Sequence, residues 1–475
     1  DTFCLTVRPW TGAARRYILQ RVNRYVFPDP EPMMGNIQRV THYLRGVIAR
    51  EGGNPARETL TLVRAMDGRP WITDASGDLW RVYLFIEGTV STDMPDSPEM
   101  FAAAGEAFGR FQRQLGGFDA ATLHPTLPDF HNTPARLQQL TNAIGADVAG
   151  RRAQAGEEIA FCMARAAQTD ALLRELEAGN VPLRVTHNDT KMDNVLLDEK
   201  TGRGVCIIDL DTVMPGLSAW DFGDAVRTGA NTAGEDERDL SRVAFSLPMF
   251  KAYVSGYLRG LGGELTRREL DLLPLGAKLM TLECGMRFLT DHLNGDRYFH
   301  IHREGHNLDR ARTQFRLVEC MEKNWDAMVE IVKNRPQELT RAELEIMQVL
   351  WAKGATVVRG ILDEMPDPKP AYNTVSTIVR ILERKGFVGH KAYGKTYEYF
   401  PLVDKDDYAG RCMDTVLENF FGGSVSRLMS FFSRHRSISV EETDAILKML
   451  RDGASDNPDA EREQADSPDR NTHAE

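Results

Sequence analysis

The sequence predicts an α/β (α+β) chain in two parts: a two-lobed fold, in which a small strand-rich lobe precedes a larger helical lobe, and then a smaller α+β domain. Three observations predict this order. Strand-like segments lie near the start of the chain, a polar motif with an apolar hairpin lies in its middle, and from about residue 340 three amphipathic helices precede a β-ribbon. With 475 residues, of which 42% are apolar, the chain is long enough for about two to four domains.

Composition argues against several classes of protein. The formal net charge of −11 argues against a chain that coats nucleic acid along its whole length, but it is compatible with one basic module. The six cysteines are scattered without a Cys-x-x-Cys pair, so neither a zinc site nor a disulfide framework is indicated. No apolar run approaches the ~18 residues of a membrane span, and no signal peptide is recognisable. We therefore expect a cytoplasmic protein with reduced thiols and no membrane partner.

Residues 1–87 are predicted to form the small lobe. Apolar residues at helical spacing predict a helix over residues 36–51, which ends at a pair of glycines. This order of strand, helix and strand, followed by a short connector at residues 86–88, is suited to a lobe that binds ATP. The adenine would then lie against the backbone of the connector. The predicted strands cover residues 3–7, 16–20 and 80–85.

A motif in the middle of the chain has the spacing that phosphoryl transfer needs: His187-x-Asp189-x-Lys191-x-x-Asn194, followed by Asp209. The reaction needs a carboxylate that orients the attacking hydroxyl and takes its proton, and it needs oxygen ligands for Mg²⁺. Asp189 suits the first role, and Asn194 and Asp209 suit the second. Lys191 is placed to offset charge on the transferred phosphate. The combination is typical of a kinase catalytic loop with its metal-binding aspartate.

A short hairpin explains how these residues meet. Residues 195–197 and 205–208 are apolar and predict two paired strands around a turn at residues 198–202. Pairing of the strands brings Asn194 beside Asp209. For any single residue an alternative stays open, because the His-x-Asp run could be a capped turn and Asp209 an ordinary carboxylate at a strand end.

The larger lobe, residues 88–333, is predicted to be mostly helical around this hairpin. Asp221 follows the hairpin, and two interpretations of it stay open: it braces the catalytic loop by hydrogen bonds, or it caps a helix. Helical periodicity is found in residues 101–115, 156–178, 240–259, 275–293 and 310–331.

Residues 1–333 resemble the aminoglycoside phosphotransferase superfamily, and within it the bacterial N-acetylhexosamine 1-kinases. The matching stretches are residues 17–23, 80–87, 185–191, 208–216, 221–224 and 281–289. The resemblance implies a protein-kinase-like fold that uses ATP and Mg²⁺ to phosphorylate the anomeric hydroxyl of N-acetylglucosamine or N-acetylgalactosamine. The glycine-rich phosphate loop of this family is expected just before Asp1, so we expect the N-lobe to be truncated and to lack that loop's N–H donors.

The same resemblance implies roles for particular residues. Asp189 is implied as the catalytic base, with Lys191 beside it. Arg287 and Tyr298 are implied to hold the sugar; without the resemblance they are equally well a helix-surface arginine and a packed tyrosine. Gln20 stands where many kinases place a phosphate-binding strand lysine. The implied metal ligands are Asn194, Asp209 and Asp211, and the implied nucleotide-binding residues are Gln20 and Glu87.

Residues 337–401 predict a winged helix-turn-helix. Thr340 and Glu343 form a capping box ahead of the first helix, and further helices are predicted over residues 357–365 and 373–385. In such a domain the third helix enters the major groove of DNA and the wing contacts phosphates. The predicted wing strands are residues 387–393 and 396–401.

The third helix and the wing are locally basic, which favours DNA binding. The alternative is a solvated helix face with a wing that binds protein. The residues predicted to contact bases are Asn373, Ser376, Thr377 and Arg380, and those predicted to contact phosphates are Lys391 and Lys395.

Residues 337–451 resemble the BlaI/MecI/CopY family of transcriptional repressors. The match lies in residues 339–347, 373–380, 385–388, 397–401 and 421–423. It implies a homodimer that binds a palindromic operator and is joined through C-terminal helices within residues 402–451, here 405–421, 425–432 and 440–450. Ser430-Phe431 replaces the Asn-Phe bond that is cleaved in antibiotic-responsive members, and Cys412 alone does not supply a copper-sensing cluster. Residues 452–475 are polar and acidic, and they predict a disordered tail.

Three hypotheses follow for the whole chain. In the first, an active sugar kinase carries the DNA-binding domain as a passenger or as a regulator. In the second, DNA binding is the working function, and the kinase domain is inactive or only senses a ligand. In the third, the join is an artefact of gene prediction or assembly.

Overall fold

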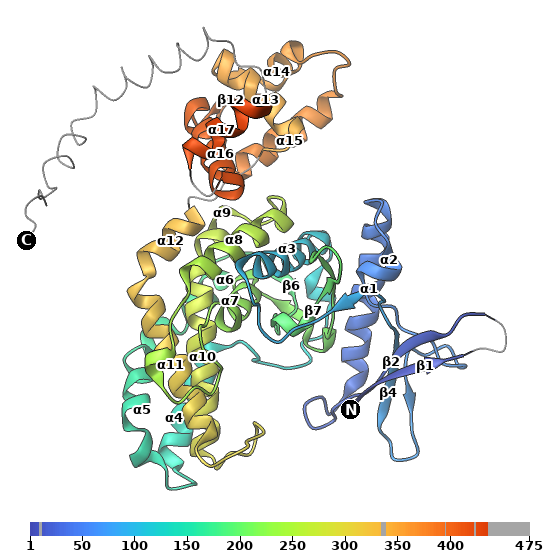
Figure 1. The fold of residues 1–475 in the computed structure, drawn as a ribbon, viewed down its shortest axis with the longest axis vertical. Coiled ribbons are helices and arrows are strands. Elements are labelled where there is room, and N and C mark those ends of the chain that lie inside the picture. Colours follow the sequence, from blue (N-terminus) through green and yellow to red (C-terminus); the bar gives the residue numbers. More distant parts are fainter. Residues whose placement is uncertain (9–11, 334–338, 395, 422–423, 436–475) are drawn as a thin grey trace, which may run out of the picture. The chain divides into compact units, whose positions relative to one another are not determined.

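The computed structural model describes residues 1–8, 12–333, 339–394, 396–421 and 424–435 (Figure 1). The chain divides into two compact units, Asp1–Leu402 and Val403–Glu475. Among the described residues, no helix is both long and apolar enough to cross a membrane.

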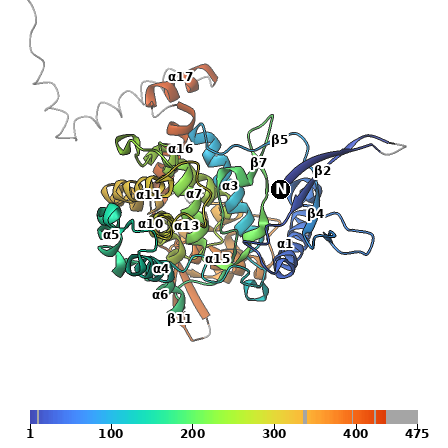
Figure 2. The ribbon, with the colours of Figure 1, turned by 90° about the horizontal axis from the view of Figure 1, so that it is seen from below.

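The small lobe is a four-stranded antiparallel sheet with one long helix. The strands are β1 (Thr2–Val7), β2 (Arg15–Arg21), β3 (Ile72–Thr73) and β4 (Leu79–Leu84), in the order β1-β2-β4-β3. Both views show β2 and β4 side by side, with α1 (Pro30–Arg50) in the same lobe (Figures 1 and 2). The helix begins six residues before its predicted start, because Asp29 caps it and Pro30 occupies its first position.

The predicted hairpin is present and is part of a small sheet between the lobes. β7 (Val195–Asp198) pairs with β8 (Gly204–Ile207), and β5 (Thr89–Val90), just after the connector, pairs with the other edge of β7. A second ribbon pairs β6 (Arg184–Thr186) with β9 (Met214–Gly216). The amide of Ile208 donates to the carbonyl of Asn194 at 3.0 Å, which brings the ends of β7 and β8 together as predicted.

Helices form the rest of the large lobe. Three of the predicted helices differ from what is observed. The predicted helix 156–178 is interrupted between α5 (Gly156–Met163) and α6 (Ala171–Glu177) by a single 3₁₀ turn. The helix predicted from residue 240 begins later, as α8 (Leu247–Leu261), because Ser246 caps it and a proline follows. The predicted helix 310–331 is divided near Asn324 into α11 (His306–Lys323) and α12 (Trp325–Lys333). The other main helices are α3 (Pro98–Gln114), α4 (Thr133–Ala146), α7 (Ser218–Gly229), α9 (Arg267–Asp271) and α10 (Leu273–Leu293).

Residues 339–402 form three helices and a small antiparallel sheet. The helices are α13 (Arg341–Lys353), α14 (Val358–Glu364) and α15 (Tyr372–Arg384), and the predicted capping box of Thr340 and Glu343 is present at the start of α13. Strands β11 (Val388–Tyr393) and β12 (Thr396–Pro401) form the predicted ribbon, and β10 (Thr356–Val357) adds a third strand that periodicity did not predict.

The described residues of the second unit form two helices, α16 (Lys405–Phe421) and α17 (Val425–His435). The bounds of α16 agree with the prediction of residues 405–421, and α17 ends three residues after the predicted range 425–432. The third predicted helix, residues 440–450, and the predicted tail, residues 452–475, lie outside the described residues.

Candidate functional site

The predicted catalytic loop, residues 187–194, follows β6, and buried carboxylates of α7 hold it in place. Asp221, in the first turns of α7, is 2% exposed and accepts the backbone N–H groups of His187 at 2.9 Å and Asn188 at 2.8 Å. Gln112 of α3 donates to the same carboxylate at 2.9 Å. The N-cap of α7 is Leu217, so the bracing interpretation of Asp221 agrees with the structure and the capping interpretation does not.

His187 ties the catalytic loop to the end of β8. Its ring is fully buried, and Nδ1 accepts the backbone N–H of Asp189 at 3.3 Å. The proton therefore belongs on Nε2, which donates to the carbonyl of Ile208 at 2.8 Å. Asn188 between them has a φ of 65°, a left-handed conformation that asparagine tolerates better than most residues. This loop conformation presents Asp189 to the cavity described below.

Asp189 is held by two side chains of its own loop. The Lys191 ammonium lies 3.0 Å from Oδ1, and the Asn194 amide donates to Oδ2 at 3.2 Å. Burial alone would lower the pKa of Lys191, but the carboxylates of Asp189 and Asp224 outweigh it, so that this pKa lies above its ordinary value. Lys191 therefore carries a full positive charge at neutral pH, next to the predicted base.

Two further carboxylates, Asp209 and Asp211, follow β8. Burial and then the neighbouring Asp211 raise the pKa of Asp209 to about 6. A bound cation would relieve this repulsion, so the donor set fits a divalent ion. Among the described residues, no three His, Cys, Asp or Glu side chains are grouped closely enough to hold a metal by themselves. The carboxylate and amide oxygens of Asp209 and Asn194 would suit Mg²⁺, which takes few protein ligands and completes its shell with phosphate and water oxygens.

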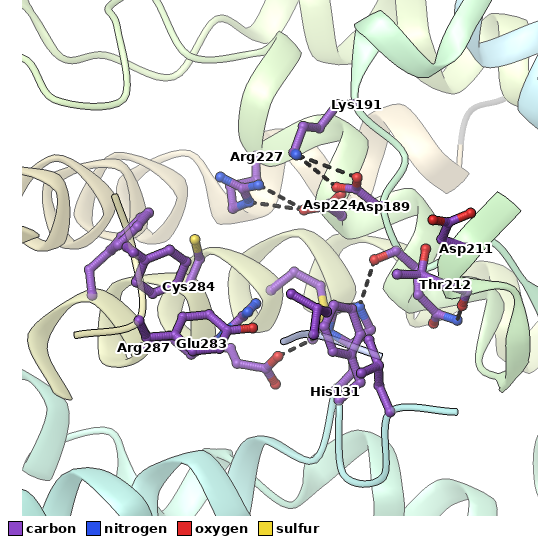
Figure 3. Close-up of a pocket in the computed structure, with 18 of the residues that line it drawn as sticks. His131, Asp189, Lys191, Asp211, Thr212, Asp224, Arg227, Glu283, Cys284 and Arg287 are labelled. Atoms are coloured by element: carbon purple, nitrogen blue, oxygen red, sulfur yellow. Dashed lines mark hydrogen bonds and ion pairs between the residues drawn. The ribbon is translucent and has the colours of Figure 1, made fainter. Parts of the chain in front are cut away.

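These residues line one cavity of about 560 Å³ between the hairpin, α7 and α10. Figure 3 shows Asp189 and Lys191 on one side of it and Glu283 and Arg287 on the other. Of the predicted site residues, the cavity brings together Asp189, Lys191, Asp209, Asp211, Arg287 and Tyr298. Asn194 is not among the lining residues, but its amide donates to Asp189.

The cations that line this cavity are paired with carboxylates, with one exception. Lys191 pairs with Asp189, Arg227 with Asp224, and Arg310 with Glu235 at the longer distance of 3.8 Å. Arg287 has no carboxylate at ion-pair distance within the described residues. Its guanidinium carbon lies 5.2 Å from the ring centre of Phe130 and 5.5 Å from that of Phe299. An unpaired cation between two aromatic rings is thus available to a ligand.

Three acids that line the cavity, Glu283, Asp224 and Glu235, already have partners within the described residues. Oε1 of Glu283 lies 2.9 Å from Nδ1 of His131, and Oε2 accepts the Thr133 hydroxyl at 2.6 Å. Arg227 donates to Asp224 at 2.9 Å and to Glu235 at 2.9 Å. His131, Glu283 and Arg227 were not identified from the sequence, because no local motif marks residues that meet only through packing.

Two predicted nucleotide-binding residues do not line the cavity. The Oε1 atom of Gln20 accepts two hydrogen bonds from the guanidinium of Arg81, at 3.1 and 3.0 Å. Glu87 is exposed, and its carboxylate pairs with Arg16, whose hydrogen bond holds the pKa of Glu87 below its usual range. Arg81 was also missed by sequence reasoning, although a charged residue at an inward position of β4 is a recognisable signal.

The predicted DNA-contacting residues lie on α15 and on the wing. Asn373, Thr377, Arg380 and Lys391 are exposed, and Ser376 is half-buried. Lys395 lies outside the described residues.

Comparison with known proteins matches two separate parts of the chain to two families. The profile of the phosphotransferase enzyme family matches residues 5–269, and that of the penicillinase repressor matches residues 339–452. The methicillin resistance regulatory protein MecI of Staphylococcus aureus (strain N315) is 25% identical over 118 residues, which are 25% of this chain and 96% of MecI. The penicillinase repressor of Bacillus licheniformis is 25% identical over 122 residues, 26% of this chain and 94% of that protein. Among solved structures, an aminoglycoside phosphotransferase from Alicyclobacillus acidocaldarius subsp. acidocaldarius is 15% identical, with a TM-score of 0.43, and covers 67% of this chain and 87% of its own.

Proposed function

Because the chain belongs to the phosphotransferase enzyme family and carries a MecI-type repressor domain after it, we propose that its first part is an ATP-dependent sugar kinase. The proposed acceptor is the anomeric hydroxyl of an N-acetylhexosamine, and the product is the sugar 1-phosphate. The observation that carries this proposal is the single cavity that holds Asp189 and Lys191 at one end and the unpaired Arg287 at the other.

The proposed mechanism uses the residues of the catalytic loop. The acceptor oxygen attacks the γ-phosphorus of ATP, its proton passes to Asp189, and the bond from the γ-phosphorus to the bridging oxygen of ADP breaks. Lys191 lies beside Asp189 and offsets negative charge on the transferred group. Mg²⁺, when held by Asn194 and Asp209, supplies positive charge to the nucleotide phosphates.

The charge near Arg287 favours a neutral acceptor over a cationic one. An ammonium group of an aminoglycoside or of choline needs a free carboxylate or an aromatic cage without a competing cation. Glu283, Asp224 and Glu235 are already paired within the protein, whereas Arg287 is not. Arg287 suits a carbonyl such as that of an acetamido group, and the exposed Tyr298 beside it offers a hydroxyl and a ring for a sugar.

Turnover with different acceptors tests this proposal. ATP consumption is measured in Mg²⁺ buffer with N-acetylglucosamine, N-acetylgalactosamine or a kanamycin-type aminoglycoside, for the unchanged chain and for Asp189→Asn. We expect sugar-dependent turnover that falls by about 10² to 10⁴-fold in the variant, because the general base is lost. Turnover with kanamycin but with neither sugar would reject an N-acetylhexosamine as the acceptor. A folded chain without turnover on any acceptor would reject the kinase function.

We propose, as a second function, that residues 337–401 bind operator DNA and that residues 402–451 join two copies in a homodimer. The match to the penicillinase repressor over residues 339–452 favours this, and so does the exposure of Arg380 and Lys391. A homodimer fits a palindromic operator, because the two half-sites mirror the symmetry of the protein.

A further inference from the structure

Arg81 lies at a polar contact between the small lobe and residues 209–213, which we call the Asp209 loop. The arginine is 3% exposed, and a guanidinium buried this deeply is unfavourable unless its N–H groups find acceptors. Gln20, directly opposite on β2, accepts from Nε and Nη2. Nη1 lies 2.5 Å from Oδ1 of Asp211. The ring of Tyr83 lies over the guanidinium, with its centre 5.3 Å from Cζ.

The Asp209 loop depends on such outside contacts for its orientation. Asp209 has a left-handed φ of 57°, and among the described residues no side chain forms a hydrogen bond or an ion pair with its carboxylate. The small lobe holds the loop at two other places. Arg81 contacts Asp211, and Asn36 of α1 donates to the carbonyl of Val213 at 3.0 Å.

We propose, on the basis of the proposed kinase function, that Arg81 is a positioning residue: anchored by Gln20, it orients the Asp209 loop through Asp211. Asp211 is then a partner of Arg81 and not a ligand of the nucleotide's metal, and Gln20 does not contact the nucleotide. A carboxylate that is neutralised by a guanidinium at 2.5 Å attracts a cation less than one that has no cationic partner. Asp209 and Asn194 therefore remain as the protein ligands.

Binding of Mn²⁺ in the presence of ADP tests the assignment of ligands without using an acceptor. The free Mn²⁺ signal is followed by electron paramagnetic resonance for the unchanged chain and for variants in an Arg81→Met background. In this background we expect Asp209→Asn to weaken Mn²⁺ binding by about ten- to hundredfold, whereas Asp211→Asn changes it by no more than about threefold. An equal loss with both substitutions would make Asp211 a direct ligand and overturn the proposal. If the chain binds Mn²⁺ with ADP but does not turn over the sugar, only the proposed acceptor is rejected. If it binds no Mn²⁺ in the presence of ADP, the proposal for Arg81 is rejected.

Thermal unfolding tests the contact itself. Arg81→Met and Asp211→Asn should each lower Tm, and the double variant should regain part of the loss, because neither member is then left buried without its partner. Strictly additive losses in Tm would contradict the pairing.

Gln20→Met tests whether Gln20 anchors Arg81. The substitution keeps the charges of Arg81 and Asp211, so it carries little risk to the fold. We expect it to weaken Mn²⁺ binding with ADP by about tenfold, as loss of a supporting contact does. Unchanged binding would reject Gln20 as the anchor. Arg21→Met, on the neighbouring position of β2, is the matched control: Arg21 pairs with the acidic side chains of Asp1 and Asp78 at the surface, and its loss should leave Mn²⁺ binding unchanged.

Discussion

At the scale of single residues, the proposed catalytic loop depends on buried groups that take no part in the proposed reaction. Asp221 accepts two backbone N–H groups of the loop, and His187 ties the loop to β8. Both act through hydrogen bonds to the backbone, so they set where Asp189 stands. The chemistry of the loop is therefore sensitive to substitutions that never contact a substrate.

Asp221→Ala should destabilise the protein and reduce turnover together. The substitution leaves the N–H groups of His187 and Asn188 buried without acceptors, at about 1–3 kcal/mol for each group. Urea unfolding followed by circular dichroism measures the loss. Asp96→Ala, at an exposed position, is the control and should change stability by less than about 0.5 kcal/mol. Equal stability of the two variants would contradict the bracing role.

Because of His292 in α10, we expect the stability of the folded protein to fall as the pH is lowered. It is 2% exposed, neither ring nitrogen has a hydrogen-bond partner among the described residues, and burial lowers its pKa below the ordinary value of 6.5. As the pH falls below 6.5, the unfolded chain takes up a proton at this residue that the folded chain does not, so stability falls.

His292→Leu should therefore reduce the loss of stability between about pH 7 and pH 5. The free energy of unfolding is measured by urea denaturation at several pH values. His42→Gln, at an exposed position of α1, is the control and should keep the slope of the unchanged chain. An unchanged slope in His292→Leu would show that other groups account for the acid dependence.

At the scale of elements, α3 and α8 pack with their backbones in direct contact. Each helix carries two glycines spaced four residues apart that lie against the backbone of the other helix: Gly105 and Gly109 on α3, and Gly256 and Gly260 on α8. A Cβ on Gly256 would overlap the carbonyl oxygen of Ala102. Close approach of two helices requires such small residues, and α3 also carries the Gln112 that supports Asp221.

Gly256→Ala should destabilise the large lobe by about 1–3 kcal/mol or more, because the backbone of α3 must move. Gly145→Ala is the matched control. It lies on the exposed side of α4 with no atom within 4 Å of its Cβ position, and it should be neutral or stabilise by up to about 1 kcal/mol. Thermal unfolding of the two variants compares them, and a neutral Gly256→Ala would contradict the close packing.

At the scale of the whole molecule, two proposed activities are carried by separate parts of one chain. The residues proposed for the kinase reaction lie within residues 1–333, and the proposed DNA contacts lie within residues 337–401. This separation allows one activity to be removed while the other is measured.

Lys391→Ala should weaken binding to a mixed-sequence duplex and reduce the slope of log affinity against log salt by about 1, because one phosphate contact is lost. Fluorescence anisotropy over a range of salt concentrations gives the slope. ATP turnover should be unchanged in this variant, and Asp189→Asn should bind the duplex as the unchanged chain does. An unchanged slope in Lys391→Ala would reject this wing contact.

The sequence by itself determined the features whose signals are local. The hairpin over β7 and β8, the capping box of Thr340 and the run from His187 to Asn194 are recognisable within short windows, because turns, caps and strand alternation depend on neighbouring residues. The helix breaks near residues 164–170 and at Asn324 were missed, since the apolar periodicity continues across them.

Only the tertiary structure decided which distant groups meet. His131 and Glu283 are 152 residues apart, and Arg81 reaches Asp211 from another lobe. These contacts depend on how helices and sheets pack, and no periodicity within one element records its neighbour. The sequence therefore determined which residues make up the proposed catalytic loop, whereas packing decided which charges around it are paired and left Arg287, among the described residues, without a carboxylate partner.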